Sequence, residues 1–434
     1  MLLELISQIG PSSIPKPILA RTGIKGGQAE LEECISTLCS FFLLAPRQKG
    51  NVFDMPTIVH LCLRIWAQKN KDSKGLTETV TKHLNELVPQ VDWSKQSIWK
   101  KYQSHAIHVL TECQDRNLKF DERFQLACRV GSWLLRVGQS ARAVPWLQQA
   151  LAWAEKSPFK YTKRRLRVQL DLAEAYAVTD ESTEAIQLTE KALKFQEKQL
   201  AKDDSSFLAV SCTLAKCQCL NGQPKKEIDR LEKLMKVESK RSVIDKFTLL
   251  VELGRCYNYA EEHQKAAECL EIGIDEAAGK FAKDDPILLL PRNNLAYAFG
   301  QKGHHRKAIS LLKETLPLLT QVLGGSHDKT LKAQSYLVDQ YLKINEPMKA
   351  ISLLEELVPI QRKTLGPVNI ETMCSEDDLA EAYFNNQNVY TALKLYEHMR
   401  LVRQNLGQSN GHRKLAEAGY QKCAETWKWT WMRR

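Results

Sequence analysis

The feature that most constrains this chain is a phrase that recurs along it. The stretch LAEAYFNNQNVYTALKL begins at Leu379, and LAEAYAVTDESTEAIQL begins at Leu172, 207 residues earlier. Intermediate copies with substitutions become visible when the small residue after the first Leu is used as a marker. The seven markers, separated by steps of 42, 42, 39, 42, 42 and 42 residues, are Gly131, Ala173, Ala215, Gly254, Ala296, Val338 and Ala380. A constant period of this length indicates an array of repeated structural units.

The residue types within one unit predict a pair of helices. A Leu, the small marker and an aromatic residue three positions later lie on one face of a helix. A polar break such as QKGHH follows, and most units then carry an Ala twelve positions after the marker. Small side chains in both helices allow close antiparallel packing. One such hairpin cannot bury its own apolar face, so it must stack against the next.

The third unit departs from this pattern. Gln218 stands in the aromatic position, Glu227 replaces the Ala, and the step that follows is three residues short. We therefore expect a loosened or bent joint at this unit. Pro317 and Pro359 share one place in consecutive second helices. Each proline removes an intrahelical hydrogen bond, so we expect a kink in both helices.

The spacing of these residues resembles the tetratricopeptide repeat (TPR). The 42-residue length is similar to the kinesin-light-chain variant, and LGGSHDKT, from Leu323 to Thr330, resembles its inter-repeat segment L-G-x-x-H-x-x-T. The resemblance implies an all-α fold, in which seven repeats over residues 121–405 form a right-handed superhelix (an α-solenoid). Residues 406–434 are expected to provide a capping helix and a tail, with the helix spanning Gly411 to Trp427.

The first 120 residues do not follow the repeat. The segment 41–55, FFLLAPRQKGNVFDM, contains two short apolar runs around a turn, which is typical of a β-hairpin. Helical runs precede and follow it, so residues 1–70 are predicted to form a small winged-helix-like domain. Residues 71–120 are predicted to form a helical linker that leads into the array.

The stretch from Phe53 to Trp66 resembles a phrase that closes the nucleotide-binding module of fungal NB-ARC or NACHT-type receptors. This chain has Pro56 and Thr57 where that family has His and Arg, and the sequence contains no G-x-x-x-x-G-K-[ST] loop. Nucleotide binding is therefore not implied, and no cofactor is expected. His60 is interpreted as a structural residue packed under the wing.

Composition argues against several other classes. The net charge of +11 is dispersed, and the one dense basic run, Lys160 to Arg167, is interpreted as a solvated helix face outside any recognised nucleic-acid-binding module, so no nucleic acid is expected. The twelve cysteines include no C-x-x-C pair, which favours reduced thiols over a metal site. No apolar run is long enough for a membrane span. Catalytic signatures such as G-x-S-x-G and H-E-x-x-H are absent. We expect a non-enzymatic, cytoplasmic protein.

Arrays of helical hairpins bind extended peptides or protein surfaces along the groove lined by their first helices. Positions three before and one, four and five after each marker are expected to face that groove. Asn293 is the foremost candidate, because kinesin-light-chain repeats use Asn at such positions. The candidate groove residues are Arg255, Asn258, Asn293, Tyr297, Gln301, Ser335, Asp339 and Lys343.

Two functional hypotheses follow. In the first, the chain is a protein-interaction scaffold, a sensor or regulatory arm related to fungal NLR-type receptors that lacks their nucleotide-binding module and acts with a full-length relative. In the second, it is a kinesin-light-chain-like cargo or scaffold adaptor. Such an adaptor needs an N-terminal heptad coiled coil. The prolines at 11, 15, 17, 56 and 89 disfavour one here, so the first hypothesis is preferred.

Overall fold

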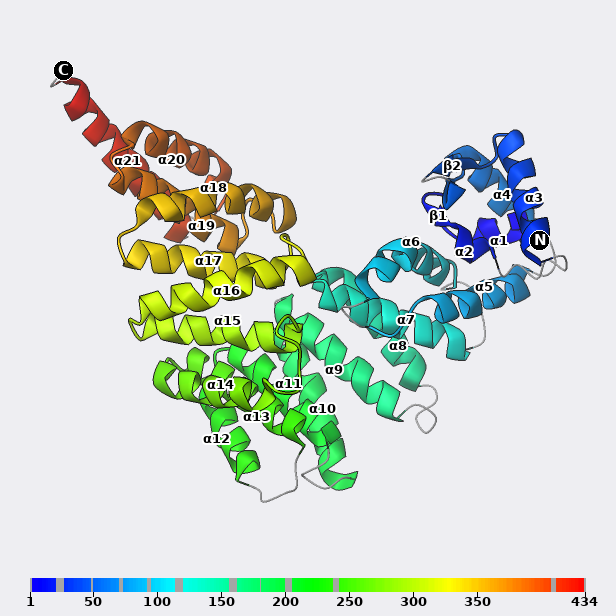
Figure 1. Cartoon of the computed structure of the whole chain (residues 1–434), viewed down its shortest axis with the longest axis horizontal. Coiled ribbons are helices and arrows are strands. Elements are labelled where there is room, and N and C mark those ends of the chain that lie inside the picture. Colours follow the sequence, from blue (N-terminus) through cyan, green and yellow to red (C-terminus); the bar gives the residue numbers. More distant parts are fainter. Residues whose placement is uncertain are drawn as a thin grey trace. The chain divides into compact units, whose positions relative to one another are not determined.

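The computed structural model divides the chain into two compact units, residues 1–199 and residues 200–434, which are described separately below (Figure 1). The described residues are 2–20, 27–47, 50–69, 73–91, 95–113, 120–155, 162–179, 181–199, 205–236, 242–406 and 411–432. Helices account for most of them, as the repeat pattern predicts. The first two residues of the basic run 160–167 lie outside the described part.

Unit 1 begins with a small domain of short helices and one three-stranded antiparallel sheet. Its elements are α1 (Leu2–Gln8), β1 (Ile14–Pro15), α2 (Lys16–Leu19), α3 (Gly27–Ser40), β2 (Ala45–Arg47), β3 (Val52–Asp54) and α4 (Thr57–Lys69). The predicted hairpin is confirmed, since β2 pairs with β3. The strand β1 was not predicted. It pairs with the other side of β3, with Ile14 opposite Phe53, and gives the strand order β1-β3-β2.

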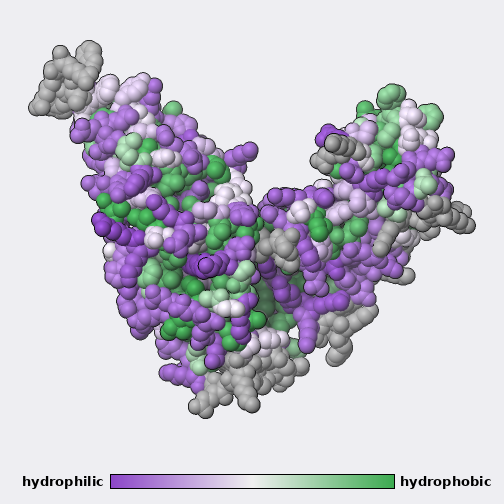
Figure 2. Space-filling view, viewed as in Figure 1, coloured by the Kyte–Doolittle hydropathy of each residue, from purple (hydrophilic) through white to green (hydrophobic). Residues whose placement is uncertain are grey.

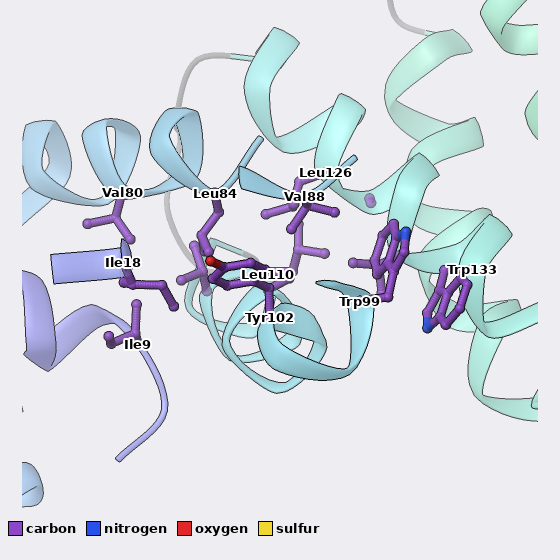
Figure 3. Close-up of a cluster of buried hydrophobic side chains, with 14 of the residues drawn as sticks. Ile9, Ile18, Val80, Leu84, Val88, Trp99, Tyr102, Leu110, Leu126 and Trp133 are labelled. Atoms are coloured by element: carbon purple, nitrogen blue, oxygen red, sulfur yellow. The ribbon is translucent and has the colours of Figure 1, made fainter. Parts of the chain in front are cut away.

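The residues expected to act as a linker form two helices that are part of the core of unit 1. Helices α5 (Ser73–Leu87) and α6 (Gln96–Cys113) pack on each other and on α7 (Phe120–Arg136), the first helix of the first repeat. The indoles of Trp99 and Trp133 stack with their centroids 5.2 Å apart, and both are buried (Figure 3). One buried apolar cluster extends from Leu2 to Ala175. The N-terminal domain and the first repeats therefore share a core.

Three buried histidines connect the N-terminal segment to the helices that follow it. The Nε2 atom of His60 lies 2.8 Å from the carbonyl oxygen of Ile9, and that of His83 lies 3.0 Å from the carbonyl of Ile18. His105 Nε2 makes a similar contact of 3.0 Å with the carbonyl of Ser13. In each pair the ring nitrogen donates, because a carbonyl oxygen only accepts. His60 is thus a buried structural residue, as expected.

Helix α4 has apolar side chains on two sides. Val59 and Leu63 pack against the core of unit 1. Ile58 and Leu61 on the other side are 78% and 54% exposed, and Ile65 and Trp66 continue the same exposed stripe. The space-filling view shows apolar surface over these N-terminal helices (Figure 2). A surface helix normally has a single apolar stripe that faces the core, so this second, exposed apolar stripe is unusual.

The seven predicted repeats are seven antiparallel helical hairpins. The hairpins of unit 1 are α7 with α8 (Ser140–Glu155) and α9 (Thr162–Val178) with α10 (Ser182–Gln199). Those of unit 2 are α11 (Ser205–Leu220) with α12 (Pro224–Met235), α13 (Val243–Tyr259) with α14 (His263–Ala277), α15 (Pro286–Gln301) with α16 (His305–Leu323), α17 (Asp328–Lys343) with α18 (Pro347–Thr364), and α19 (Ile370–Asn385) with α20 (Val389–Arg403).

Each marker lies in the first helix of its hairpin and is buried, and so is the residue twelve positions later. The close approach of the two helices is visible at Gly254, where an added Cβ would lie 2.5 Å from Cγ of Leu270. The residue seven positions after the marker has a positive φ in all six hairpins whose turn is described there. These are Gly138, Gly222, Glu261, Gly303, Asn345 and Gln387. The predicted register is therefore confirmed.

The third repeat accommodates its two unusual polar residues by burying them. Gln218 and Glu227 are 4% and 1% exposed, and the Glu227 carboxylate pairs with Arg230. The Arg230 guanidinium also donates to the carbonyl of Ser211 at 2.9 Å. The division between the two units falls just before this repeat. The bent joint itself stays a prediction, as do the kinks in α16 and α18, which run continuously through their prolines.

The last helix, α21 (Gly411–Met432), packs against α20 and α19. An added Cβ on Gly419 would overlap the ring of Tyr396, so the two helices are in tight contact. Ala416 and Cys423 are fully buried on the same side. A helix is present where the capping helix is expected, and it continues to Met432 instead of ending at Trp427. Its role as a cap stays a prediction. A further first helix would occupy the same place beside α20.

Candidate functional site

Tyrosines and carboxylates gather on one face of the first helices of unit 2. We call this the first-helix face. Its side chains lie two positions before and one or five positions after the markers, positions that share one side of a helix. The six residues that define it are Tyr259, Tyr297, Tyr336, Asp339, Lys343 and Asp378. They come from α13, α15, α17 and α19, four consecutive first helices.

The aromatic part of the face is built around Tyr297. Its ring centroid lies 5.0 Å from that of Tyr336 on the next first helix. On the other side, the ring of His263 meets it edge-on at 5.8 Å. Burial raises the pKa of both tyrosines, so their hydroxyls stay neutral and can donate and accept hydrogen bonds. Such rings offer a large apolar contact with a polar end, the usual anchor in protein interfaces.

The acidic part lies beside the tyrosines. Burial raises the pKa of Asp339, an effect opposed by Lys343 and His305. Burial also raises the pKa of Asp378 to about 6, and the neighbouring charges of Asp339, Asp377 and Glu381 add to this, while Lys343 lowers it. Half-buried carboxylates that repel one another favour the approach of a cation. This part of the face therefore suits a lysine or arginine side chain of a partner.

A pocket of ≈ 520 Å³ lies in unit 2 at the turns of the third and fourth repeats. Its walls include Pro224 and Lys226 from the start of α12, Tyr259 at the end of α13, and Glu261 in the turn that follows α13. Tyr259 thus belongs both to this pocket and to the first-helix face. The pocket extends the face toward the third repeat and adds basic side chains to its rim.

Of the eight candidate residues, the structure brings Tyr297, Asp339 and Lys343 together on the first-helix face. Gln301 is exposed at the C-terminal end of α15. Ser335 is half-buried and its hydroxyl donates to the carbonyl of Leu331 within the same helix. Arg255 pairs with Glu252 one turn earlier on α13.

Asn258 and Asn293 are placed differently from the expectation. They are only 8% and 5% exposed, because their positions face the next first helix instead of the open surface. The Asn258 amide donates to the carbonyl of Asn294 at 3.1 Å, and the Asn293 amide donates to that of Lys329 at 3.3 Å. Both residues therefore hold consecutive first helices together. Among the described residues, Asn293 Oδ1 has no hydrogen-bond partner.

Sequence reasoning missed Tyr336 and Asp378, which lie two positions before their markers. A signal was available. Positions −2, +1 and +5 relative to the marker fall on one side of a helix, since they are three and four residues apart. The set chosen from sequence instead included positions −3 and +4, which are rotated toward the neighbouring repeat. The error was thus one of helix rotation and not of register.

The described part of the chain contains no group of three His, Cys, Asp or Glu side chains that could hold a metal ion. Among the same residues, no helix is both long and apolar enough to cross a membrane.

No family model and no curated protein matches this chain. The solved structures that resemble it are TPR-like repeat proteins, and the fold is that of a TPR-like α-solenoid. One is a kinesin light chain-like protein of Podosopora anserina with nearly identical TPR-like repeats. It is 30% identical over 46% of this chain and 96% of its own, with a TM-score of 0.38.

Two further neighbours cover more of the chain. A Signal Transduction ATPase with Numerous Domains (STAND) from Pyrococcus horikoshii, which has a tetratricopeptide repeat sensor, matches 96% of this chain at 17% identity and a TM-score of 0.53. This chain spans only 58% of that protein. A Rap protein complexed with competence and sporulation factor matches 80% of this chain and 94% of its own, at 12% identity and a TM-score of 0.51.

Proposed function

We propose that this chain is a protein-interaction scaffold and that the first-helix face of unit 2 binds a peptide or an extended segment of a protein. The observation that carries this proposal is the convergence of Tyr297, Tyr336, Asp339 and Asp378 from three consecutive repeats. An extended ligand crosses several first helices, so contributions from successive helices are what such a ligand requires. The Rap neighbour, solved with competence and sporulation factor, is a repeat protein that holds a partner.

The chemistry of the face specifies the partner in part. The tyrosine rings favour an aromatic or aliphatic side chain, and the carboxylates of Asp339 and Asp378 favour a basic side chain next to it. We therefore propose a segment with a basic residue beside an apolar one.

We further propose that the chain acts as the sensor or regulatory arm of a receptor of the fungal NLR type, together with a relative that carries the nucleotide-binding module. Two observations support this proposal. The STAND neighbour, which has a tetratricopeptide repeat sensor, matches 96% of this chain, including the N-terminal residues that precede the repeats. The exposed stripe of Ile58, Leu61, Ile65 and Trp66 on α4 offers an apolar surface that such a module would cover.

The alternative function is a kinesin-light-chain-like cargo or scaffold adaptor. The Podosopora anserina structure supports it through a sequence identity of 30% over 46% of this chain. In both cases we propose a non-enzymatic, cytoplasmic protein without a cofactor.

A peptide-display selection on the full chain tests the binding surface. We expect selected peptides to contain a basic residue next to an apolar one. Binding measured by calorimetry should weaken about 30-fold or more for Tyr297→Ala, since an interface anchor contributes about 2 kcal/mol or more. Asp339→Asn should weaken binding through the basic residue. Tyr390→Ala, at an exposed tyrosine on a second helix, is the matched control and should leave affinity unchanged.

A second experiment on the full chain distinguishes the receptor arm from the kinesin-light-chain-like adaptor. Affinity purification from its source cells, followed by mass spectrometry, should recover a protein with a nucleotide-binding module, and Leu61→Lys should abolish this recovery. Recovery of a kinesin heavy chain would instead support the adaptor. Peptide binding that survives Tyr297→Ala, Tyr336→Ala and Asp339→Asn together would show that the first-helix face is not the site.

A further inference from the structure

Cys374, His412 and Asp377 form a connected group of side chains at the last hairpin of unit 2. Cys374 and Asp377 lie on α19, and His412 lies on α21, which packs against it. Cys374 Sγ is 3.9 Å from His412 Nε2, and His412 Nδ1 is 2.7 Å from Asp377 Oδ2. Cys374 is exposed, so a small molecule can reach its sulfur. A thiol beside a histidine that a carboxylate orients is the arrangement that activates a nucleophile.

The hydrogen bonds of Asp377 fix the tautomer of His412. One oxygen of the carboxylate accepts from the Arg403 guanidinium at 2.6 Å, and the other contacts His412 Nδ1. Because a carboxylate oxygen accepts, Nδ1 carries the proton. The lone pair of Nε2 in the neutral ring is therefore directed toward the thiol of Cys374. It is placed to receive the proton of that thiol.

Arg403 keeps this group in place. Its side chain is fully buried and donates also to the Glu376 carboxylate at 2.9 Å and to the carbonyls of Met373 and His412, both at 3.0 Å. These contacts join α19, α20 and the start of α21. Arg403 is thus a positioning residue for Asp377 and His412.

We propose that Cys374 is a nucleophilic thiol and a site of covalent modification by low-molecular-weight disulfides and small carbon electrophiles. In the reaction with a disulfide, Cys374 Sγ forms a bond to one of its two sulfurs and the disulfide bond breaks. His412 Nε2 accepts the proton of Cys374 and passes it to the departing thiolate. The products are a mixed disulfide on Cys374 and one free thiol, so the small disulfide itself is the oxidant.

The local backbone explains why this chemistry is preferred to acyl transfer. Acyl transfer forms an oxyanion that needs free N–H donors. At the start of α19, the N–H of Glu371 donates to the side chain of Asn369 and the N–H of Met373 donates to its carbonyl, both at 2.9 Å. Attack on a sulfur or on an alkyl carbon forms no oxyanion and needs no such donors.

The charges around Cys374 make its reactivity depend on His412. The partial burial of Cys374 raises the pKa of its thiol, and the carboxylates of Asp378, Asp377 and Glu371 add to this, while Arg403 opposes it. The resting group is therefore a thiol and not a thiolate. His412 therefore acts as the general base that removes the thiol proton during the attack.

The experiment uses the full chain in its reduced state. It is treated with iodoacetamide at pH 7.5, quenched at intervals and digested, and mass spectrometry follows each cysteine separately. Cys62, exposed on α4, is the internal control. We expect Cys374 to react about tenfold faster than Cys62, since a positioned general base contributes about a hundredfold and the raised pKa of the Cys374 thiol offsets part of this gain. Exposure to 2-hydroxyethyl disulfide should place the mixed disulfide first on Cys374.

The variant His412→Gln separates base catalysis from mere accessibility. We expect its Cys374 rate to fall to that of Cys62, while the Cys62 rate stays unchanged. Unfolding of α21 would uncover Cys374 and accelerate its reaction, so a slower rate cannot come from a damaged fold. Equal rates of Cys374 and Cys62 in the native chain, or a Cys374 rate that His412→Gln does not reduce, would overturn the proposal.

Discussion

The two units bury their apolar side chains in different ways. In unit 1, one cluster joins residues from Leu2 to Ala175, and its largest members include the stacked Trp99 and Trp133. In unit 2, clusters are local, as with Phe247, Ala277 and Leu288, which come from one hairpin and the helix that follows it. A shared core makes distant segments depend on one another, whereas stacked repeats depend mainly on their neighbours. The effect of a mutation should therefore spread in unit 1 and stay local in unit 2.

The largest effect is expected from Trp99→Ala. Removing a fully buried indole costs about 3–5 kcal/mol of unfolding free energy, and here it also removes the partner of Trp133. Hydrogen exchange should accelerate across unit 1, from α1 to α9. The control is Trp427→Ala, at a tryptophan that is 39% exposed, which should cost little. If lost protection were confined to α6 and α7, the shared core of unit 1 would not behave as one cooperative body.

The corresponding change in unit 2 is Arg403→Met. Removing this buried guanidinium breaks its ion pairs with Asp377 and with the Glu376 carboxylate, which is only 3% exposed and keeps Arg362 as its partner. Because Arg362 still compensates part of the buried charge, we expect a cost of about 3 kcal/mol, the lower end for a broken buried ion pair. We expect faster hydrogen exchange in α19, α20 and α21 and unchanged protection in α13 to α16.

Arg400→Met is the matched control, because Arg400 forms an ion pair with Glu417 in which both side chains are more than a third exposed. It should cost less than about 1 kcal/mol. If Arg403→Met also lowered protection in α13 to α16, unit 2 would be more cooperative than its local clusters indicate.

A smaller effect with a defined pH dependence is expected at Asp378. Its pKa of about 6 in the folded chain lies above the ordinary value of about 3.9. The folded state therefore binds more protons than the unfolded state between about pH 4 and pH 6, and stability falls as the pH rises through this range. Asp378→Asn, which cannot ionise, should stabilise unit 2 by about 1–2 kcal/mol at pH 7.5, and this gain should vanish near pH 4.

Unfolding in urea at the two pH values measures this difference. Asp229→Asn, at an exposed aspartate on α12, serves as the control and should give the same stability change at both. A gain from Asp378→Asn that does not depend on pH would show that its charge is not the cause.

The smallest effect is expected at the turn of the last hairpin. Gln387 has a φ of 64°, whereas Gly303 occupies the equivalent turn position with a φ of 80°. Because glycine adopts this region without steric cost, Gln387→Gly should raise the free energy of unfolding, by about 0.5–1 kcal/mol. Gly303→Ala should have the opposite sign. Thermal unfolding of the two variants would show whether the turns of unit 2 are equivalent, and a destabilised Gln387→Gly would show that they are not.

The sequence predicted unit 2 more fully than unit 1, for a physical reason. A helical repeat brings together residues at fixed short separations, so Ala296 and Ala308 could be paired from spacing alone. The strand β1 has only Ile14 and Pro15, and it is fixed by pairing with Val52 and Phe53 far along the chain. No local pattern carries that information.

The candidate site was predicted only in part, because the array of repeats does not reveal how each helix is rotated about its axis. Tyr297, Asp339 and Lys343 were identified because positions +1 and +5 belong both to the helix face expected from sequence and to the face observed in the structure. Asn258 and Asn293 were misplaced because the sequence pattern is the same for an amide that faces solvent and for one that donates to a carbonyl of the next repeat. Contacts between neighbouring helices decide that question, and they are not encoded in spacing.

The close packing of α21 on the α19–α20 hairpin has a consequence for how the number of repeats could change. Gly419 leaves room for the ring of Tyr396, which stands sixteen residues after its marker. The same position is a leucine in the hairpins α13–α14, α15–α16 and α17–α18, namely Leu270, Leu312 and Leu354. Helix α21 is therefore matched to one particular hairpin. Duplication or deletion of 42-residue blocks upstream of that hairpin would leave this contact intact, so gene rearrangement could lengthen or shorten the first-helix face without changing the packing of α21.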